Sequence, residues 1–183
     1  MAYKGKLVNN HKTGQQIEFI TTAKDSNGKL LEMVTTYKPY STPPIAHYHP
    51  VQHEYFTVLQ GELTVQLKND TLVLKKGDSI DIPANTIHNM WNNSAATTVV
   101  SWKVVPAMQT EYFLETAIGL VEDNKTNDKG VPGILQFALM AGRYSNELRL
   151  AKPSYIIQKI LFGILRPIAL IAGKKAVYSK YID

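Results

Sequence analysis

Residues 47–54 read HYHPVQHE, and four of the five histidines of the chain lie between positions 47 and 88. His47 and His49 are two positions apart. Side chains along a strand alternate between its two faces, so these imidazoles are expected on the same side. Both can therefore reach one ion.

Two further residues that can bind a metal, Glu54 and His88, follow in the sequence. Glu54 is five residues beyond His49, so in an unbroken strand the two side chains would face opposite sides. Pro50 interrupts the strand pairing and permits a turn that brings Glu54 to the same side as His49. His88 can supply a fourth ligand from a separate strand. Neutral imidazoles with one carboxylate suit divalent iron, manganese, nickel, copper or zinc, with positions left for water or substrate.

The spacing of these residues resembles the two signature motifs of the cupin superfamily. The first motif, HxHx4Ex6G, covers residues 47–61, and the second, Gx5PxNx2Hx3N, covers residues 77–92. The matching residues are His47, His49, Glu54 and Gly61 in the first motif and Gly77, Pro83, His88 and Asn92 in the second. Asn85 stands where the family usually has glycine, a mild departure because asparagine tolerates the left-handed backbone.

The resemblance implies a small antiparallel β-barrel, a double-stranded β-helix or jelly roll, over residues 30–105. It also implies a metal held at the centre by His47, His49, Glu54 and His88. His53 can replace Glu54, orient it or face outward. Adjacent strand residues face opposite ways, so we expect Glu54 inward and His53 outward. Asn92 is expected to support the backbone rather than to react.

The pattern of short apolar segments predicts an all-β domain without reference to any family. Strands are expected at residues 16–22, 29–38, 54–60, 63–67, 71–74, 79–82 and 97–105, and around His88. Turn signals separate them every eight to twelve residues or so, as in a sandwich or barrel. We expect residues 1–106 to form the barrel with its lead-in strands.

The character of the sequence changes after residue 106. Apolar residues at helical spacing predict helices over residues 109–121, 132–142 and 154–165, and residues 166–167, Arg-Pro, are expected to break or kink the last one. Residues 107–183 therefore form a helical extension, packed on the barrel or on a partner subunit. Such an extension resembles those of some bacterial cupins without assigned function.

Composition narrows the function classes. The 183 residues are 44% hydrophobic and include no cysteine, so the chain can bury a full core and any metal must be held by nitrogen and oxygen. The first ten residues lack the apolar core of a signal peptide, which favours the cytoplasm. A homodimer is expected, because pairing protects sheet edges.

The carboxyl-terminal tail is strongly basic. Residues 149–183 carry seven lysines and arginines against one acid, Asp183. Nucleic-acid binding is not expected, since no stacking aromatic residues are interleaved with this charge on a groove or recognition element. A membrane span is not expected either, because Lys159, Arg166 and Lys174 interrupt the apolar run. Contact with an anionic membrane surface is the alternative to packing on protein.

Two functional readings follow from the residues and the resemblance. Cupins with this ligand set include dioxygenases, oxalate-degrading enzymes and isomerases, so we expect an enzyme acting on a small molecule. The alternative is a non-catalytic module that binds a small ligand or metal as a sensor or store. A second acid or base in the cavity separates them, and the candidates are Tyr37, Tyr40, Tyr48 and Gln66. The helical tail can also act as a lid or a dimer clamp.

Overall fold

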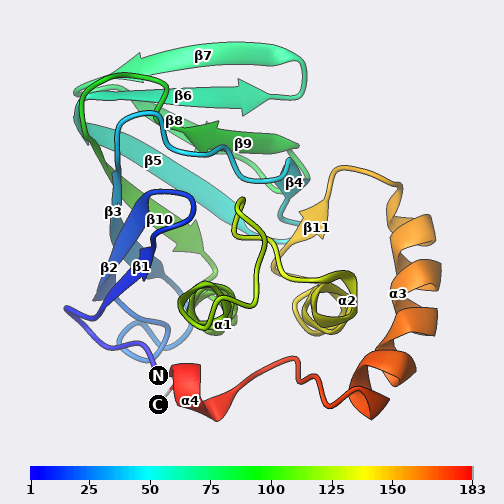
Figure 1. The fold of residues 1–183 in the computed structure, drawn as a ribbon. Helices are drawn as coiled ribbons and strands as arrows, with labels where there is room; N and C mark the ends of the chain where they lie inside the picture. The colour runs from blue at the N-terminus through cyan, green and yellow to red at the C-terminus, as the bar shows by residue number, and fades with distance from the viewer. Residues whose placement is uncertain (183) are drawn as a thin grey trace.

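Two antiparallel sheets face each other in the computed structural model, which describes residues 1–182 (Figure 1). The first sheet has the order β1-β2-β3-β10-β5-β8: β1 Leu7–Asn10, β2 Gln15–Thr21, β3 Leu31–Tyr37, β10 Thr98–Val105, β5 His53–Gln60 and β8 Ser79–Ile82. The second has the order β11-β4-β9-β6-β7: β11 Arg149–Leu150, β4 His47–Tyr48, β9 His88–Trp91, β6 Glu62–Leu67 and β7 Asp70–Lys75. This is the expected antiparallel jelly-roll arrangement of a cupin.

The core between the sheets follows from alternation along the strands. In β5, Glu54, Phe56 and Val58 are buried while Tyr55 between them is exposed. The buried side chains that meet between the sheets are Tyr37, Phe56, Val58, Leu63, Val65, Ile82, Met90 and Val100. Because inward residues of one strand share a face, the register that buries Phe56 and Val58 also carries Glu54 inward.

The turn at Gly61, the last residue of the first motif, explains why that position is glycine. Its φ is +76°, and a Cβ there would lie 2.6 Å from the carbonyl oxygen of Thr97. Any other residue would clash with the backbone that leads into β10, so glycine lets β5 turn tightly into β6.

The helices gather at one end of the sheets (Figure 1). They are α1 Thr110–Glu122, α2 Ile134–Arg143, α3 Tyr155–Ile171 and the short α4 Ser179–Ile182. α1 packs against β1, α2 against α3, and α4 against α1. Between α2 and α3, β11 pairs with β4, so the carboxyl-terminal extension adds a strand to the second sheet.

α3 is longer than the sequence predicted. The helix runs through Pro167 to Ile171, so the chain does not break at residues 166–167, and a kink there stays a prediction. A proline ring crowds the carbonyl group four residues earlier, and that residue is Gly163, whose backbone has the freedom to accommodate it. In residues 1–182, no helix is both long enough and apolar enough to cross a bilayer.

Candidate metal centre

Three histidines converge where β4 and β9 pair. His47 in β4 lies opposite His88 in β9, and His49 follows β4 directly. One ring nitrogen from each lies within 4.8 Å of the others. The ring centroids are 4.6 Å to 5.3 Å apart. Residues distant in the sequence thus present three imidazoles to one point.

The carboxylate of Glu54 reaches the same point from the opposite sheet. Its Oε2 atom lies 3.0 Å from Nε2 of His49 and 2.9 Å from Nε2 of His88, and its side chain is 1% exposed. Ligand atoms held about 2.1 Å from one ion lie roughly 3 to 3.5 Å from each other. The separations of Glu54 from His49 and His88 therefore fit a shared ion. Within the described residues, the donor atoms that all lie within 4.8 Å of one another are those of the three histidines.

Backbone carbonyl groups fix the tautomer of all three rings. Nδ1 of His47 contacts the carbonyl oxygen of Ile45 at 2.8 Å, Nδ1 of His88 that of Thr86 at 2.9 Å, and Nδ1 of His49 that of Glu147 at 2.5 Å. A carbonyl oxygen only accepts, so each Nδ1 carries a proton, and each Nε2 presents a lone pair when its ring is neutral. Metal-bound histidines are usually oriented in this way.

Charge at the site is balanced by Glu54. Burial, together with the neighbouring imidazoles, lowers the pKa of His47 to about 3, which keeps that ring neutral. Burial opposes ionisation of Glu54, but His49 and His88 outweigh it and hold its pKa well below the usual range. Burial likewise opposes the charge on His49, and Glu54 outweighs it and raises the pKa of the ring. A buried carboxylate that balances an imidazolium can equally balance a metal cation.

Two buried atoms at the centre lack hydrogen bonds within residues 1–182. They are Nε2 of His49 and Oε2 of Glu54, which lie close together but not in hydrogen-bonding geometry. Buried polar atoms normally have partners, and leaving one unpaired is costly. A divalent transition ion would satisfy both atoms, so the residues present fit such an ion.

Trp102 orients the carboxylate. Its indole Nε1–H donates to Oε1 of Glu54 at 2.9 Å, which leaves Oε2 facing the imidazoles. The sequence analysis did not single out Trp102. The pairing of β10 with β5 places it beside Glu54, and a contact between residues 48 positions apart leaves no local signal in the sequence.

The asparagines of the second motif hold its backbone. Asn85 has a φ of +65°, as its place in the motif suggested, and its side chain donates to the carbonyl oxygen of Pro50 at 3.2 Å. It thereby ties the turn before His88 to the segment after His49. Asn92 is fully buried and bridges backbone groups, donating to Lys38 at 3.0 Å and accepting from the N–H of Ser94 at 2.9 Å.

His53 points away from this cluster. Its side chain is 45% exposed and lies 3.9 Å from the carboxylate of Asp81 on the outer face of the first sheet. The neighbouring Glu54 faces inward, as strand alternation requires. The structure thus brings together His47, His49, Glu54 and His88 and leaves His53 outside.

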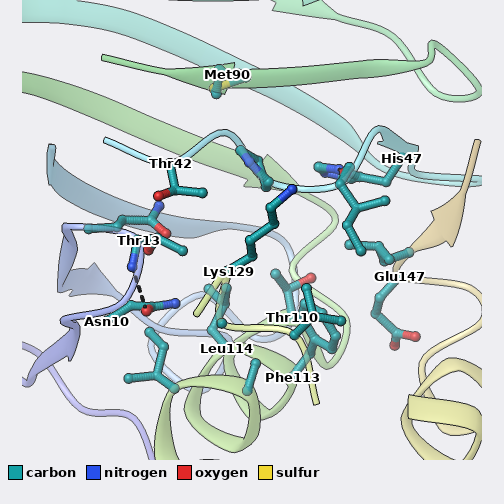
Figure 2. Close-up of a pocket in the computed structure, with 18 of the residues that line it drawn as sticks. Asn10, Thr13, Thr42, His47, Met90, Thr110, Phe113, Leu114, Lys129 and Glu147 are labelled. Carbon is teal, nitrogen blue, oxygen red and sulfur yellow. Dashed lines mark hydrogen bonds between the residues drawn. The ribbon is translucent and has the colours of Figure 1, made fainter. Parts of the chain in front are cut away.

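A cavity of about 230 Å³ opens above the cluster, between the barrel and the carboxyl-terminal extension (Figure 2). Its walls are largely apolar and include Phe56, Met90, Trp102, Phe113, Leu114 and Phe137. Figure 2 shows the side chain of Lys129 extending into it from the loop between α1 and α2.

Of the four candidate acid or base residues, Tyr37, Tyr40, Tyr48 and Gln66, only Tyr37 is among the described residues that line the cavity. Its hydroxyl group lies 3.4 Å from Nε2 of Gln15, and burial, with the charge of Glu54, raises its pKa. Tyr40 is instead 69% exposed. The cavity therefore contains a protonated hydroxyl group besides the four clustered residues.

Known proteins share this architecture. Residues 33–103 match the cupin domain family. Quercetin 2,3-dioxygenase of Bacillus subtilis is 30% identical over 102 residues, which make up 55% of this chain and only 30% of that enzyme. A probable oxidoreductase, virH of Hypocrea virens, is 28% identical over 153 residues, 77% of this chain and 68% of that protein.

A solved structure shows the same fold. The RmlC-like cupin of Shewanella frigidimarina superposes with a TM-score of 0.50 at 16% identity, over 61% of this chain and 92% of its own. The paired motifs, the two facing sheets and the match over residues 33–103 agree in identifying a cupin domain in this part of the chain.

Proposed function

We propose that this protein is a metal-dependent enzyme that acts on a small molecule in the cavity above His47, His49, Glu54 and His88. One observation carries the proposal: three imidazoles with fixed tautomers and a buried carboxylate converge at the floor of a largely apolar cavity. Iron, manganese, nickel, copper or zinc bound there would supply a Lewis acid and, for the redox-active ions, access to dioxygen chemistry.

The lining of the cavity favours a small aromatic or enolic substrate with an ionisable oxygen. Phe56, Phe113 and Phe137 offer apolar and aromatic walls, while the ammonium group of Lys129 offers a partner for an anion. The Bacillus subtilis relative is named for the oxidation of quercetin, a compound of that class. We therefore propose a dioxygenase-like reaction.

The residues of the chain have separable roles in this proposal. Lys129 binds the ionised oxygen of the substrate, and the hydroxyl group of Tyr37 donates a hydrogen bond to the substrate, because its raised pKa keeps it protonated. The wall formed by α1 and α2 excludes water from the cavity, so the carboxyl-terminal extension acts as a lid.

Oxygen uptake tests the proposal. The protein is loaded with each metal in turn, and dioxygen consumption is followed with quercetin as the probe. We expect uptake that requires both metal and protein and disappears in Glu54→Gln, a change that keeps the size of the side chain but removes its charge. Tight binding of quercetin without uptake, whichever metal is loaded, would favour the non-catalytic binding module instead.

A further inference from the structure

The outward side of α3 is aliphatic and exposed. Along this side lie Ile156, Ile157, Ile160, Leu161, Ile164, Ile168 and Ile171, each between 42% and 89% exposed. At about 3.6 residues per turn these positions fall within one broad stripe along the helix. Figure 1 shows α3 at the outer edge of the molecule, beyond α2.

A second, narrower stripe of α3 already packs against the protein. Gln158, Phe162 and Ala169 are buried, and the ring of Phe162 lies 5.7 Å from that of Phe137 on α2. A helix at the surface of a domain normally has one apolar stripe, which faces the core. The outward stripe of α3 is therefore an addition that packing of the monomer does not explain. Large exposed apolar patches usually mark an interaction surface.

The charge around this stripe selects the partner. Residues 148–182 contain no acidic residue and seven basic ones: Arg149, Lys152, Lys159, Arg166, Lys174, Lys175 and Lys180. Of these, Lys180 is paired with Asp123, and Arg166 lies against α2. A second copy of the chain docked on α3 would bring two sets of these cations together. A partner with an apolar layer for the isoleucines and negative charge for the basic residues fits α3 better than a second copy does. A bilayer that contains anionic lipids has both.

We propose that α3 docks this protein onto the surface of a membrane that contains anionic lipids. The helix lies in the interface with its isoleucines among the acyl chains, and Lys159, together with Lys174 and Lys175 beyond its end, lies at the headgroups. It does not span, because its 17 residues measure about 25 Å and include Lys159 and Arg166.

Vesicle flotation tests the proposal with the full-length protein. The probes are vesicles of phosphatidylcholine alone and of equal parts phosphatidylcholine and phosphatidylserine. We expect the parent protein to float with the anionic vesicles, to stay behind with the neutral ones, and to be released from the anionic ones by high salt.

Two double variants locate the binding face. Ile160→Asp with Ile164→Asp places two charges in the stripe and should reduce binding at least about tenfold, because those side chains no longer enter the apolar layer. Val73→Asp with Ile134→Asp is the matched control: it adds the same charge at residues that are 53% and 55% exposed on other surfaces. It should retain most of the parent's binding, and circular dichroism should show both variants folded.

The lysines are tested separately. Replacing Lys159, Lys174 and Lys175 by glutamine should weaken binding to anionic vesicles and reduce its dependence on salt. Arg166 is left unchanged, since its guanidinium group lies against the backbone of Gly142 on α2.

Three results would overturn the proposal. One is a parent protein that does not float with anionic vesicles. Another is equal binding by the parent and the Ile160→Asp, Ile164→Asp variant. The third is a parent that is dimeric without lipid and becomes monomeric in that variant, which would make the stripe a subunit interface.

Discussion

The metal centre and α3 depart from ordinary burial in opposite directions. At the centre, titratable side chains that usually face water are buried, with Glu54 1% exposed. On α3, isoleucines that usually face a core are exposed, up to 89% at Ile171. Both arrangements cost free energy unless something outside the chain compensates. The comparison indicates where the chain requires other molecules: a cation at one place and an apolar surface at the other.

The two regions also differ in how firmly the protein holds them. Each imidazole of the centre has a backbone partner for Nδ1, and Glu54 has Trp102. The main packing partner of α3 is one helix, α2. The side chains of the centre are thus held by the barrel and by Glu147 of the extension, whereas the outer side of α3 is exposed.

The largest expected effect is the loss of stabilisation by metal when His88 is replaced by alanine. A metal at 100 times its dissociation constant stabilises the parent by about 2.7 kcal/mol, which corresponds to roughly 5 to 10 °C in Tm. Thermal unfolding with and without added metal should show this shift in the parent and its absence in His88→Ala. His53→Ala is the control, because that ring faces outward. An unchanged shift in His88→Ala would remove this residue from the site.

A change beside the centre should separate binding from chemistry. Tyr37→Phe removes the hydroxyl group that we propose donates a hydrogen bond to the reacting substrate, and the expected fall in kcat with quercetin is about 100-fold. Metal content should stay at the parental level, because Tyr37 is not among the four clustered residues. Steady-state kinetics and metal analysis of the same preparation check this. Equal kcat in both proteins would assign Tyr37 to packing alone.

A smaller effect should follow from removing the hydrogen bond that holds the carboxylate of Glu54. Trp102→Phe keeps an aromatic ring but removes the N–H that holds Oε1 of Glu54. Loss of such a supporting hydrogen bond should weaken metal affinity about tenfold. Competition with a chelating dye measures this affinity. Trp91→Phe is the control, because that indole does not contact Glu54; equal weakening by both changes would argue against an orienting role.

The smallest effect concerns the anchor of the segment that follows α3. Asp123 at the end of α1 accepts hydrogen bonds from Lys125 at 2.8 Å, from the hydroxyl group of Tyr181 at 2.7 Å and from Lys180. These donors lower the pKa of Asp123 below its ordinary value of 3.8. Its contribution to stability is therefore complete above that value and is lost as the pH falls through the lowered pKa.

Asp123→Asn should accordingly lower Tm slightly at neutral pH and free Ser179–Ile182 for faster hydrogen exchange. The difference between parent and variant should shrink as the pH falls below 3.8. Asp128→Asn, at a fully exposed side chain paired with Lys12 at 3.3 Å, is the control. A difference that grows at acid pH would contradict the assignment.

Patterns in the sequence predicted most of the barrel and indicated that the four residues of the candidate metal centre lie close together. The strands from β2 to β10, apart from the two-residue β4, follow from apolar alternation and turn residues. The resemblance of the two motifs to those of cupins is what singled out His47, His49, Glu54 and His88. The alternation is a local signal, because the sequence of a single strand already shows which of its residues share one side.

Features that depend on distant pairing were missed. β1 has only Val8 buried among its four residues, and β11 is two residues long and is defined by pairing with β4. The carbonyl group of Glu147 and the indole of Trp102 reach the centre only through such pairings. Whether the apolar stripe of α3 is covered by protein was left open, because periodicity shows that a helix has an apolar side but not what covers it.

Elemental analysis tests the central claim most directly. The protein is purified without an affinity tag or chelator, incubated with each of the five candidate ions and freed of excess, beside a His49→Ala, Glu54→Ala double variant treated identically. We expect close to one ion of iron, manganese, nickel, copper or zinc per parent chain and almost none in the variant. Equal metal in the two proteins, or none in either, would contradict a metal centre at these residues.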